Sequence, residues 1–400
     1  MPARSRRAQS LDEATPSASA LHDAPAQTSQ QSLFNKTEID LLRTSLIGWF
    51  RRGHRDMPWR KLADPYAIWI SEIMLQQTRV DTVRSYFQRF MASFPTIQAL
   101  AAAPQEQVLA LWSGLGYYAR ARNLHAAAQQ VVQRHGGIFP SDPEAVQELR
   151  GIGPYTAGAI LSIAFGQRAP LLDGNVIRVL SRLRALSEPA ETTVGKRLFW
   201  SLAAELVPPP RAKREVNDPG DFNQALMELG ATVCLPQRPV CLVCPVASLC
   251  RARQLGQVEH YPPAKKAKSV PVVQVLVLVV RAQGQLLLLR RPPLGLWGGL
   301  WEPPTLNLEL GESPREALPR LLRERLNLRP EVLPSVAELP AFVHLLTHRE
   351  MHFAPFLLDW SGVLPSLRLS GYEEARLVDP QQPLALGLSA WVSTLLRRVA

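Results

Sequence analysis

The four cysteines of this 400-residue chain all fall within one short segment, as Cys234, Cys241, Cys244 and Cys250. A secreted disulfide-bonded protein of this length would normally spread its cysteines more widely, so the pattern favours a reducing compartment. Four thiolates are soft ligands that complete either a zinc site or an iron–sulfur cluster. Zinc sites usually present two close cysteine pairs, and only Cys241 and Cys244 form one here. The spacing therefore favours an iron–sulfur cluster and leaves zinc as the alternative.

The charge balance predicts an anionic partner. The formal net charge is +11 and the sequence pI is about 9.9. A basic face binds nucleic acid because it releases the counterions held by phosphates, although a solvated basic surface without a partner is the alternative. The longest apolar run, Val270–Val280, is too short to span a bilayer and is typical of a buried strand, so no membrane association is expected.

The chain divides into segments that differ in amino-acid composition and in the pattern of apolar residues. Residues 1–32 are rich in Ala, Ser and Gln with almost no large apolar side chains, which predicts a disordered tail. Apolar residues at helical spacing, separated by Gly and Pro, indicate a mainly helical region over 33–253. Residues 254–270 are polar, basic and proline-bearing, as expected of a linker, and 271–400 shows buried-strand patterns with one helical stretch. The predicted fold class is therefore multidomain, a mainly α region followed by an α+β domain.

A glycine-bearing turn separates two predicted helices. Within Leu149–Ala157, Gly151 and Gly153 permit a tight turn, and Pro154 suits a first helical position. The N-terminus of the following helix would offer backbone donors and a positive dipole end to a phosphate. An ordinary interhelical turn is the alternative, because G-x-G alone is weak.

Two carboxyl groups stand in contexts that suit catalysis. Glu72 lies in the largely apolar segment 69–78, where burial would raise its pKa, although helical phase leaves a solvent-facing side chain open. Asp173 lies in the stretch LDGNV, where a simple turn or a helix N-cap explains it as well.

Several stretches resemble the MutY adenine glycosylases, which belong to the helix-hairpin-helix superfamily of endonuclease III. They are W-x-S-E-x-M-L-Q-Q-T at 69–78, MPWR at 57–60, LWSGLGYYARARNLH at 111–125, FNQALMELGA at 222–231 and LWGGLW at 296–301. The cysteine spacing and the hairpin resemble the same superfamily, and the similarity spans nearly all of 36–360.

The resemblance implies a role for each candidate residue. Protonated Glu72 would donate to N7 of adenine, ionised Asp173 would stabilise an oxocarbenium-like sugar, and Tyr155 and Asn175 would orient them. The cysteines would hold a structural 4Fe-4S cluster in a loop at 234–250 that positions a basic segment on DNA. The residues expected to contact DNA or the extruded base are Gln77, Tyr117, Trp59, Arg60, Arg55, Gly151 and Gly153. Core packing for the tryptophan and phosphate binding for the arginines are the alternatives.

By the same resemblance, 271–400 is a Nudix-like domain that recognises 8-oxoguanine through Thr347 and His348. Leu346 stands where the family carries an aromatic ring, so this position departs from the family pattern and offers no ring for stacking. A working Nudix hydrolase needs clustered glutamates after an Arg-Glu pair, and neither Arg315-Glu316 nor Arg323-Glu324 is followed by them. Nucleotide hydrolysis is therefore not expected.

The expected function is monofunctional hydrolysis of the N-glycosidic bond of adenine mispaired with 8-oxoguanine or guanine in double-stranded DNA. An endonuclease III-like glycosylase/lyase is one alternative, but that group places a lysine nucleophile where Tyr155 stands, and tyrosine cannot form its Schiff base. A non-enzymatic iron–sulfur DNA-binding protein is another, which would leave Glu72 and Asp173 unexplained. The resemblance also implies a monomer in the bacterial cytoplasm, associated with the nucleoid.

Overall fold

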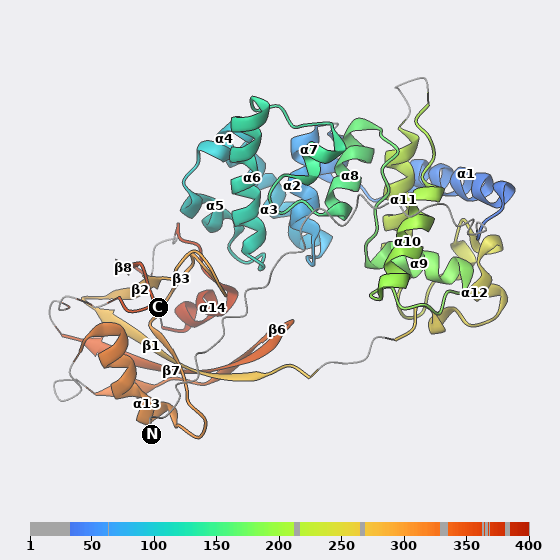
Figure 1. Ribbon diagram of the computed structural model, residues 1–400. Coiled ribbons are helices and arrows are strands. Elements are labelled where there is room, and N and C mark those ends of the chain that lie inside the picture. Colours follow the sequence, from blue (N-terminus) through green and yellow to red (C-terminus); the bar gives the residue numbers. More distant parts are fainter. Residues whose placement is uncertain are drawn as a thin grey trace, which may run out of the picture.

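The computed structural model describes residues 33–62, 64–211, 217–264, 269–328, 335–361, 364, 367, 369–380 and 385–399. The predicted disordered tail, 1–32, lies outside these residues. Figure 1 shows a helical region followed by a domain built around a sheet, which confirms the predicted fold class.

The N-terminal region consists of helices joined by turns and loops. They are α1 (Lys36–Gly53), α2 (Pro65–Leu75), α3 (Val80–Ser93), α4 (Ile97–Ala102), α5 (Gln105–Trp112), α6 (Ala119–His135), α7 (Pro143–Gln147), α8 (Pro154–Phe165), α9 (Gly174–Arg184), α10 (Thr193–Leu206), α11 (Asp218–Thr232) and α12 (Arg251–Gln254). A 3-10 turn, η2 (Pro58–Lys61), lies between α1 and α2.

Two apolar cores hold these helices together. One core lies among α2 to α6 and has Trp69, Phe90 and Trp112 at its centre. The other lies among α1, α9, α10 and α11. Helix α8 contributes Ala157 to the first core and Ala159 to the second, so it is apolar on all sides and joins the two.

The C-terminal domain is a mixed sheet with one helix on each face. Its elements are β1 (Val272–Ala282), β2 (Gln285–Arg290), β3 (Trp301–Glu302), β4 (Thr305–Asn307), α13 (Pro314–Leu321), a π-helical turn (Leu322–Leu326), β5 (Val336–Glu338), β6 (Phe342–Leu346), β7 (Arg349–Trp360), β8 (Glu374–Val378) and α14 (Ala390–Val399). The strand order is β3-β2-β1-β7-β5, with β4 paired to β1, β6 to β7 and β8 to β2, and only β1 and β7 run parallel among the described strand pairs.

The continuous apolar run of β1 is explained by burial on both faces. Val277 packs into the core that contains Trp391 of α14, whereas its neighbour Leu278 packs into the core that contains Leu321 of α13. A strand covered on one face only would alternate apolar and polar side chains instead.

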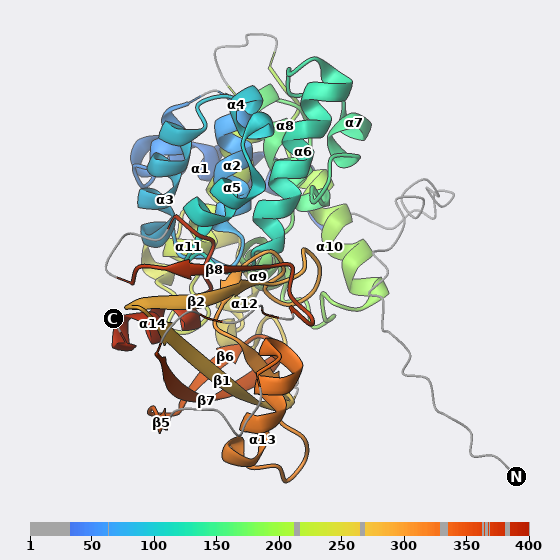
Figure 2. The same ribbon diagram turned by 90° about the vertical axis from the view of Figure 1, so that its left-hand side faces the viewer.

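The C-terminal domain lies against the helical region at the turn between α5 and α6 (Figures 1 and 2). Leu300, which precedes β3, belongs to the same apolar core as Trp112. The last helix of the helical region ends at Gln254 and β1 begins at Val272. The predicted linker between them contains a 3-10 turn, Val258–His260, and its residues 265–268 lie outside the described residues.

Candidate active site

Helix α2 carries Glu72 into the centre of the helical region. Asp64 caps the helix by accepting from the backbone N–H groups of Tyr66 and Ala67, and Pro65 occupies its first turn. Nine of the 11 residues of α2 are buried, and Glu72 is only 5% exposed. The sequence left its orientation open, and the structure turns the carboxyl inward.

The predicted hairpin places Tyr155 opposite that carboxyl group. Gly151 has φ +79°, a left-handed conformation that suits glycine, and Gly153 is the N-cap of α8 with Pro154 at its first position. Tyr155 therefore lies in the first turn of α8, where its hydroxyl donates to Glu72 Oε2 at 2.7 Å and lies 3.3 Å from Met227 Sδ.

Asp173 is the N-cap of α9. Its Oδ1 accepts from the backbone N–H of Val176 at 2.7 Å, and its Oδ2 accepts from Asn175 Nδ2 at 3.0 Å. The N-cap interpretation of the LDGNV stretch is thus correct for the local structure, and the same side chain also faces a pocket.

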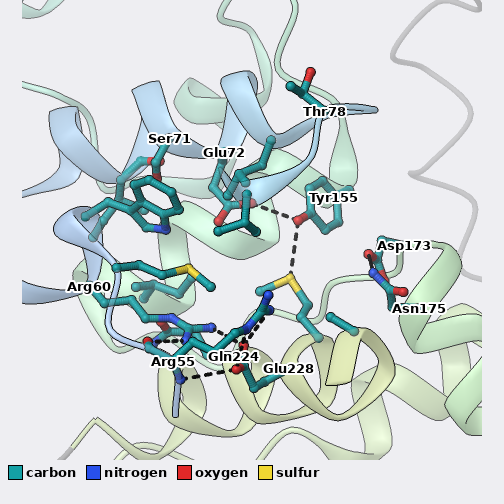
Figure 3. A pocket seen from close by; sticks show the side chains of 18 residues that line it. Arg55, Arg60, Ser71, Glu72, Thr78, Tyr155, Asp173, Asn175, Gln224 and Glu228 are labelled. Atoms are coloured by element: carbon teal, nitrogen blue, oxygen red, sulfur yellow. Dashed lines mark hydrogen bonds and ion pairs between the residues drawn. The ribbon is translucent and has the colours of Figure 1, made fainter. Parts of the chain in front are cut away.

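One pocket of about 180 Å³ brings together most of the predicted catalytic and base-contacting residues. They are Glu72, Asp173, Tyr155, Asn175, Trp59, Arg60 and Arg55. Figure 3 shows Glu72 and Tyr155 pointing toward one another, with Asp173 and Asn175 at one side and the arginines at the opposite wall. Gln77, Tyr117, Gly151, Gly153, Thr347 and His348 do not line this pocket.

The two carboxyl groups experience different electrostatic surroundings. Burial raises the pKa of Glu72 to about 7, and the nearby charge of Asp173 adds to this, while the Tyr155 hydrogen bond and Arg60 oppose it. Burial also raises the pKa of Asp173, but hydrogen bonds from Val176 and Asn175 favour its ionised form. Glu72 can consequently hold a proton near neutrality.

A charged wall opposite Glu72 contains a residue that the sequence reasoning did not single out. Glu228 of α11 is 2% exposed and accepts from Arg55 Nε at 2.7 Å and from Arg60 Nη2 at 2.9 Å. Burial raises its pKa, but the two arginines outweigh this and lower the pKa overall. Gln224 and Met227 of α11 line the same pocket and were also missed. The only signal was the resemblance of FNQALMELGA, which does not say which side chains face the site.

A chain of hydrogen bonds joins Asp173 to the first cysteine. Asn175, which donates to Asp173, accepts from Arg178 Nη2 at 2.8 Å, and Arg178 Nε donates to the carbonyl oxygen of Cys234 at 2.8 Å. One turn further along α9, Arg182 donates to Cys234 Sγ at 3.3 Å. Helix α9 therefore joins the cysteine loop to the pocket that Glu72 and Asp173 line.

The four cysteines line one small cavity of about 30 Å³, together with Arg182 and Arg253. None of the four forms a disulfide, and all are half-buried. Within the described residues, no group of three or more His, Cys, Asp or Glu side chains is arranged to hold a metal ion. The soft donor set and its shared cavity still fit the thiolate ligation of an iron–sulfur cluster.

The two residues expected to enter the DNA stack both have strained backbone conformations. Gln77 has φ +56° and Tyr117 has φ +48°, values that are uncommon for residues other than glycine and that concentrate at functional sites. Arg120, which the sequence reasoning missed, joins their segments, because its guanidinium donates to the carbonyl oxygens of Gln76 at 2.5 Å and Gly116 at 3.2 Å.

Thr347 and His348 lie at a second pocket, between the two domains. This pocket of about 350 Å³ is also lined by Tyr117, Trp297 and Leu346. Of the predicted residues outside the first pocket, Tyr117, Thr347 and His348 therefore line the pocket at the domain boundary, whereas Gln77, Gly151 and Gly153 line neither pocket.

Comparison with known proteins agrees with this architecture. Residues 70–204 match the HhH-GPD superfamily of base excision DNA repair proteins, and residues 275–398 match the NUDIX domain. The fold and the pocket thus define a base-excision DNA repair protein of the helix-hairpin-helix class with an appended Nudix-like domain.

Curated relatives show which family within this class the chain resembles. The chain is 39% identical to the adenine DNA glycosylase of Homo sapiens, an alignment that covers 85% of this chain and 71% of the relative. The Mus musculus adenine DNA glycosylase is 38% identical over 83% of this chain and 73% of its own, and that of Buchnera aphidicola subsp. Acyrthosiphon pisum is 32% identical over 78% and 85%. The chain belongs to the adenine DNA glycosylase family, and it is an enzyme that acts on DNA. None of the helices within the described residues has both the length and the apolarity to cross a membrane.

Replacing Glu72 by glutamine is expected to stabilise the fold most strongly above neutral pH. An unfolded glutamate has a pKa of about 4.3, whereas burial raises the folded pKa to about 7. Between these two pKa values the folded state keeps a proton that the unfolded state loses. The free energy of unfolding of the wild type therefore declines as pH rises from the lower value to the higher. Glutamine cannot ionise, so the excess in melting temperature of Glu72→Gln over wild type should grow from about pH 5 to about pH 8.

The matched control is the exposed Glu148→Gln, whose melting temperature should follow wild type at each pH. A stability difference between Glu72→Gln and wild type that does not increase with pH would contradict a buried, proton-holding Glu72.

Proposed function

We propose that this adenine glycosylase excises adenine paired with 8-oxoguanine or guanine in double-stranded DNA, using Glu72 as the general acid and Asp173 as the carboxylate that stabilises the sugar. The observation that carries the proposal is a carboxyl group with a pKa of about 7 that shares one pocket with a second, hydrogen-bonded carboxyl group. Pairs of carboxyls whose surroundings separate their roles are the arrangement that glycosidic bond cleavage uses.

The reaction requires an extruded adenine, because the bond is unreachable inside the duplex. Protonated Glu72 donates its proton to N7 of the base, and the bond between the sugar C1′ and N9 then breaks with its electron pair leaving on adenine. Ionised Asp173 stabilises the positive charge that develops on the sugar. Glu72, now ionised, accepts a proton from the water whose oxygen bonds to C1′, so the acid is regenerated.

The surrounding side chains suit recognition of a purine. Arg55 and Arg60 present donors, and the carboxylate of Glu228 presents acceptors, at the wall opposite Glu72. Tyr155 holds the Glu72 carboxyl in place, and Asn175 does the same for Asp173. A lysine nucleophile is absent from the position of Tyr155, which favours a monofunctional glycosylase over the endonuclease III-like alternative.

The pocket between the domains is proposed to receive the base opposite the adenine. The hydroxyl of Thr347 and the imidazole of His348 offer donors and acceptors there, whereas Leu346 offers no ring for stacking. Gln77 and Tyr117 would occupy the space that the extruded nucleotide leaves. The functional units are then 33–253 and 271–400, joined by the linker 254–270.

The cysteine cavity is proposed to hold a 4Fe-4S cluster, which would brace the loop at 234–250. Cys234, Cys241, Cys244 and Cys250 would be its ligands, and Arg238, Arg251 and Arg253 would present positive charge to DNA phosphates beside it. We further propose that the protein acts as a monomer in the bacterial cytoplasm, associated with the nucleoid.

Glu72→Gln and Asp173→Asn should each abolish most base excision while DNA binding is retained. Loss of a general acid slows such reactions by about 10²- to 10⁴-fold, and loss of charge stabilisation by about 10²- to 10³-fold. The measurement is single-turnover excision from an 8-oxoguanine:adenine duplex, read by alkali cleavage of the adenine strand, with Glu148→Gln as the active control. A near-wild-type rate for either variant would refute the assignment, and no alkali-labile site with wild-type protein would refute the proposed substrate.

Tyr155→Lys should introduce strand cleavage that the wild type lacks. A lysine amine at this position can attack the sugar carbon and form a Schiff base, which borohydride traps as a covalent adduct with DNA. Tyr155→Phe is the matched control, since it removes the hydroxyl without supplying an amine. Strong trapping by the wild-type protein would instead favour the glycosylase/lyase alternative.

The purified protein should contain about four iron atoms and about four inorganic sulfide ions per chain. Cys244→Ser removes one proposed ligand and should lower both contents. These contents are measured by chemical analysis for iron, sulfide and zinc. A stoichiometric zinc content without sulfide would establish the zinc alternative.

A further inference from the structure

One backbone carbonyl of the C-terminal domain receives two hydrogen bonds from the helical region. The carbonyl oxygen of Leu388 accepts from the hydroxyl of Tyr118 at 2.5 Å and from Ser113 Oγ at 2.8 Å. The N–H of the same Leu388 donates back to Ser113 Oγ at 3.3 Å. Tyr118 is only 5% exposed and its bond to Leu388 is buried, which strengthens that bond, whereas the two Ser113 bonds are partly buried.

Close packing surrounds this contact. Gly387 lies so near α5 that a Cβ atom there would be 2.9 Å from Leu109 Cβ, and Leu300 lies in the same core as Trp112. At the rim, Arg122 Nη1 donates to the carbonyl oxygen of Gly298 at 2.7 Å, while Arg376 and Glu106 form an ion pair at 3.1 Å.

On the helical side, the contact holds the turn that carries Tyr117. Ser113 and Tyr118 bracket this turn, and the hydroxyl of Tyr118 also accepts from the backbone N–H of Gly114 at 3.1 Å. Arg120 joins the turn to the end of α2, because it donates to the carbonyl oxygens of Leu115 and Gln76.

On the C-terminal side, Leu388 lies two residues before α14 and is connected to the wall of the pocket that carries Thr347. Leu388 forms a parallel bridge with Trp301 of β3. Trp391 of α14 stacks on Phe353 of β7, with ring centroids 4.4 Å apart, and β7 pairs with β6, which leads into the turn at Thr347. The two walls of the pocket between the domains are thus each connected rigidly to Leu388.

We propose that Tyr118 is a positioning residue for selectivity toward the base opposite the adenine, because its hydrogen bond to Leu388 sets the separation between Tyr117 on one wall and Thr347 and His348 on the other. The inference rests on the proposed function, in which this pocket receives the opposite base. Tyr118 itself supplies no part of the chemistry at Glu72. Ser113 assists it at the same carbonyl oxygen.

The test is the ratio of single-turnover excision rates for 8-oxoguanine:adenine and guanine:adenine duplexes. Tyr118→Phe removes only the hydroxyl, and it should lower this ratio by about two- to tenfold, which is the range expected from its one hydrogen bond across the domain interface. Ser113→Ala should also lower the ratio, whereas Ser113→Thr, which keeps a hydroxyl, should retain the wild-type ratio.

Tyr66→Phe is the matched control. Tyr66 is as buried as Tyr118, and its hydroxyl also donates to a backbone carbonyl oxygen, that of Phe94 at 2.8 Å, but within the helical region. Thermal unfolding should show comparable losses of stability for Tyr66→Phe and Tyr118→Phe, whereas only Tyr118→Phe should change the ratio. If Tyr118→Phe acted only through a general loss of stability, both variants would change the ratio to the same extent.

The outcomes separate this inference from the function on which it rests. A high wild-type ratio that survives in both Tyr118→Phe and Ser113→Ala would overturn the positioning role alone, as would an equal fall in Tyr66→Phe. Adenine excision with a wild-type ratio near one would overturn the proposed readout of 8-oxoguanine, and the positioning role with it. Absence of excision from either duplex would overturn the proposed function as a whole.

Discussion

The burial of the Glu72 carboxyl group in an apolar helix is the constraint on which the rest of the structure depends. An ionised carboxylate without compensation is costly there, so the site retains the proton and raises the pKa to about 7. Tyr155 can approach Glu72 only because the Gly151 turn redirects the chain and starts α8 beside α2. The packing of α2 and α8 in one core is thus what gives the pocket an acid that is protonated near neutral pH.

The same fold places a second carboxyl group, that of Asp173, in different surroundings. Burial raises its pKa as well, but its place at the N-terminus of α9 supplies a backbone donor, and Asn175 supplies another. Arg178 holds Asn175 and is itself bound to the carbonyl oxygen of Cys234. The cysteine loop therefore contributes to the orientation of Asp173 without lying in the pocket. A structural cluster at that loop would be coupled to catalysis through the position of helix α9.

The sequence allowed much of this arrangement to be predicted, and the limits follow from what a sequence pattern contains. The apolar run of β1 and the hairpin glycines are local signals, so both elements were predictable. The inward direction of Glu72 was not, because α2 is apolar on every side and its pattern defines no single buried face. Glu228 and Arg120 act through contacts between elements distant in the chain, and no spacing rule brings α11 to η2 or α6 to the end of α2. The acceptor at Leu388 is a backbone carbonyl group. Every residue type has one, so the sequence does not indicate this contact.

The proposed function imposes a geometric requirement on the contact between the domains. If excision takes place at one base of a pair and discrimination depends on the other base, the two pockets must keep a fixed relation for recognition to affect the rate. A long linker alone cannot supply that relation, because its conformational freedom would make each docking of the domain costly in entropy. Buried hydrogen bonds at Leu388, close packing at Gly387 and the rim ion pair supply it before DNA binds. An opposite base bound in the pocket between the domains would then contact the turn of Tyr117, which Arg120 joins by hydrogen bonds to the end of the helix that holds Glu72.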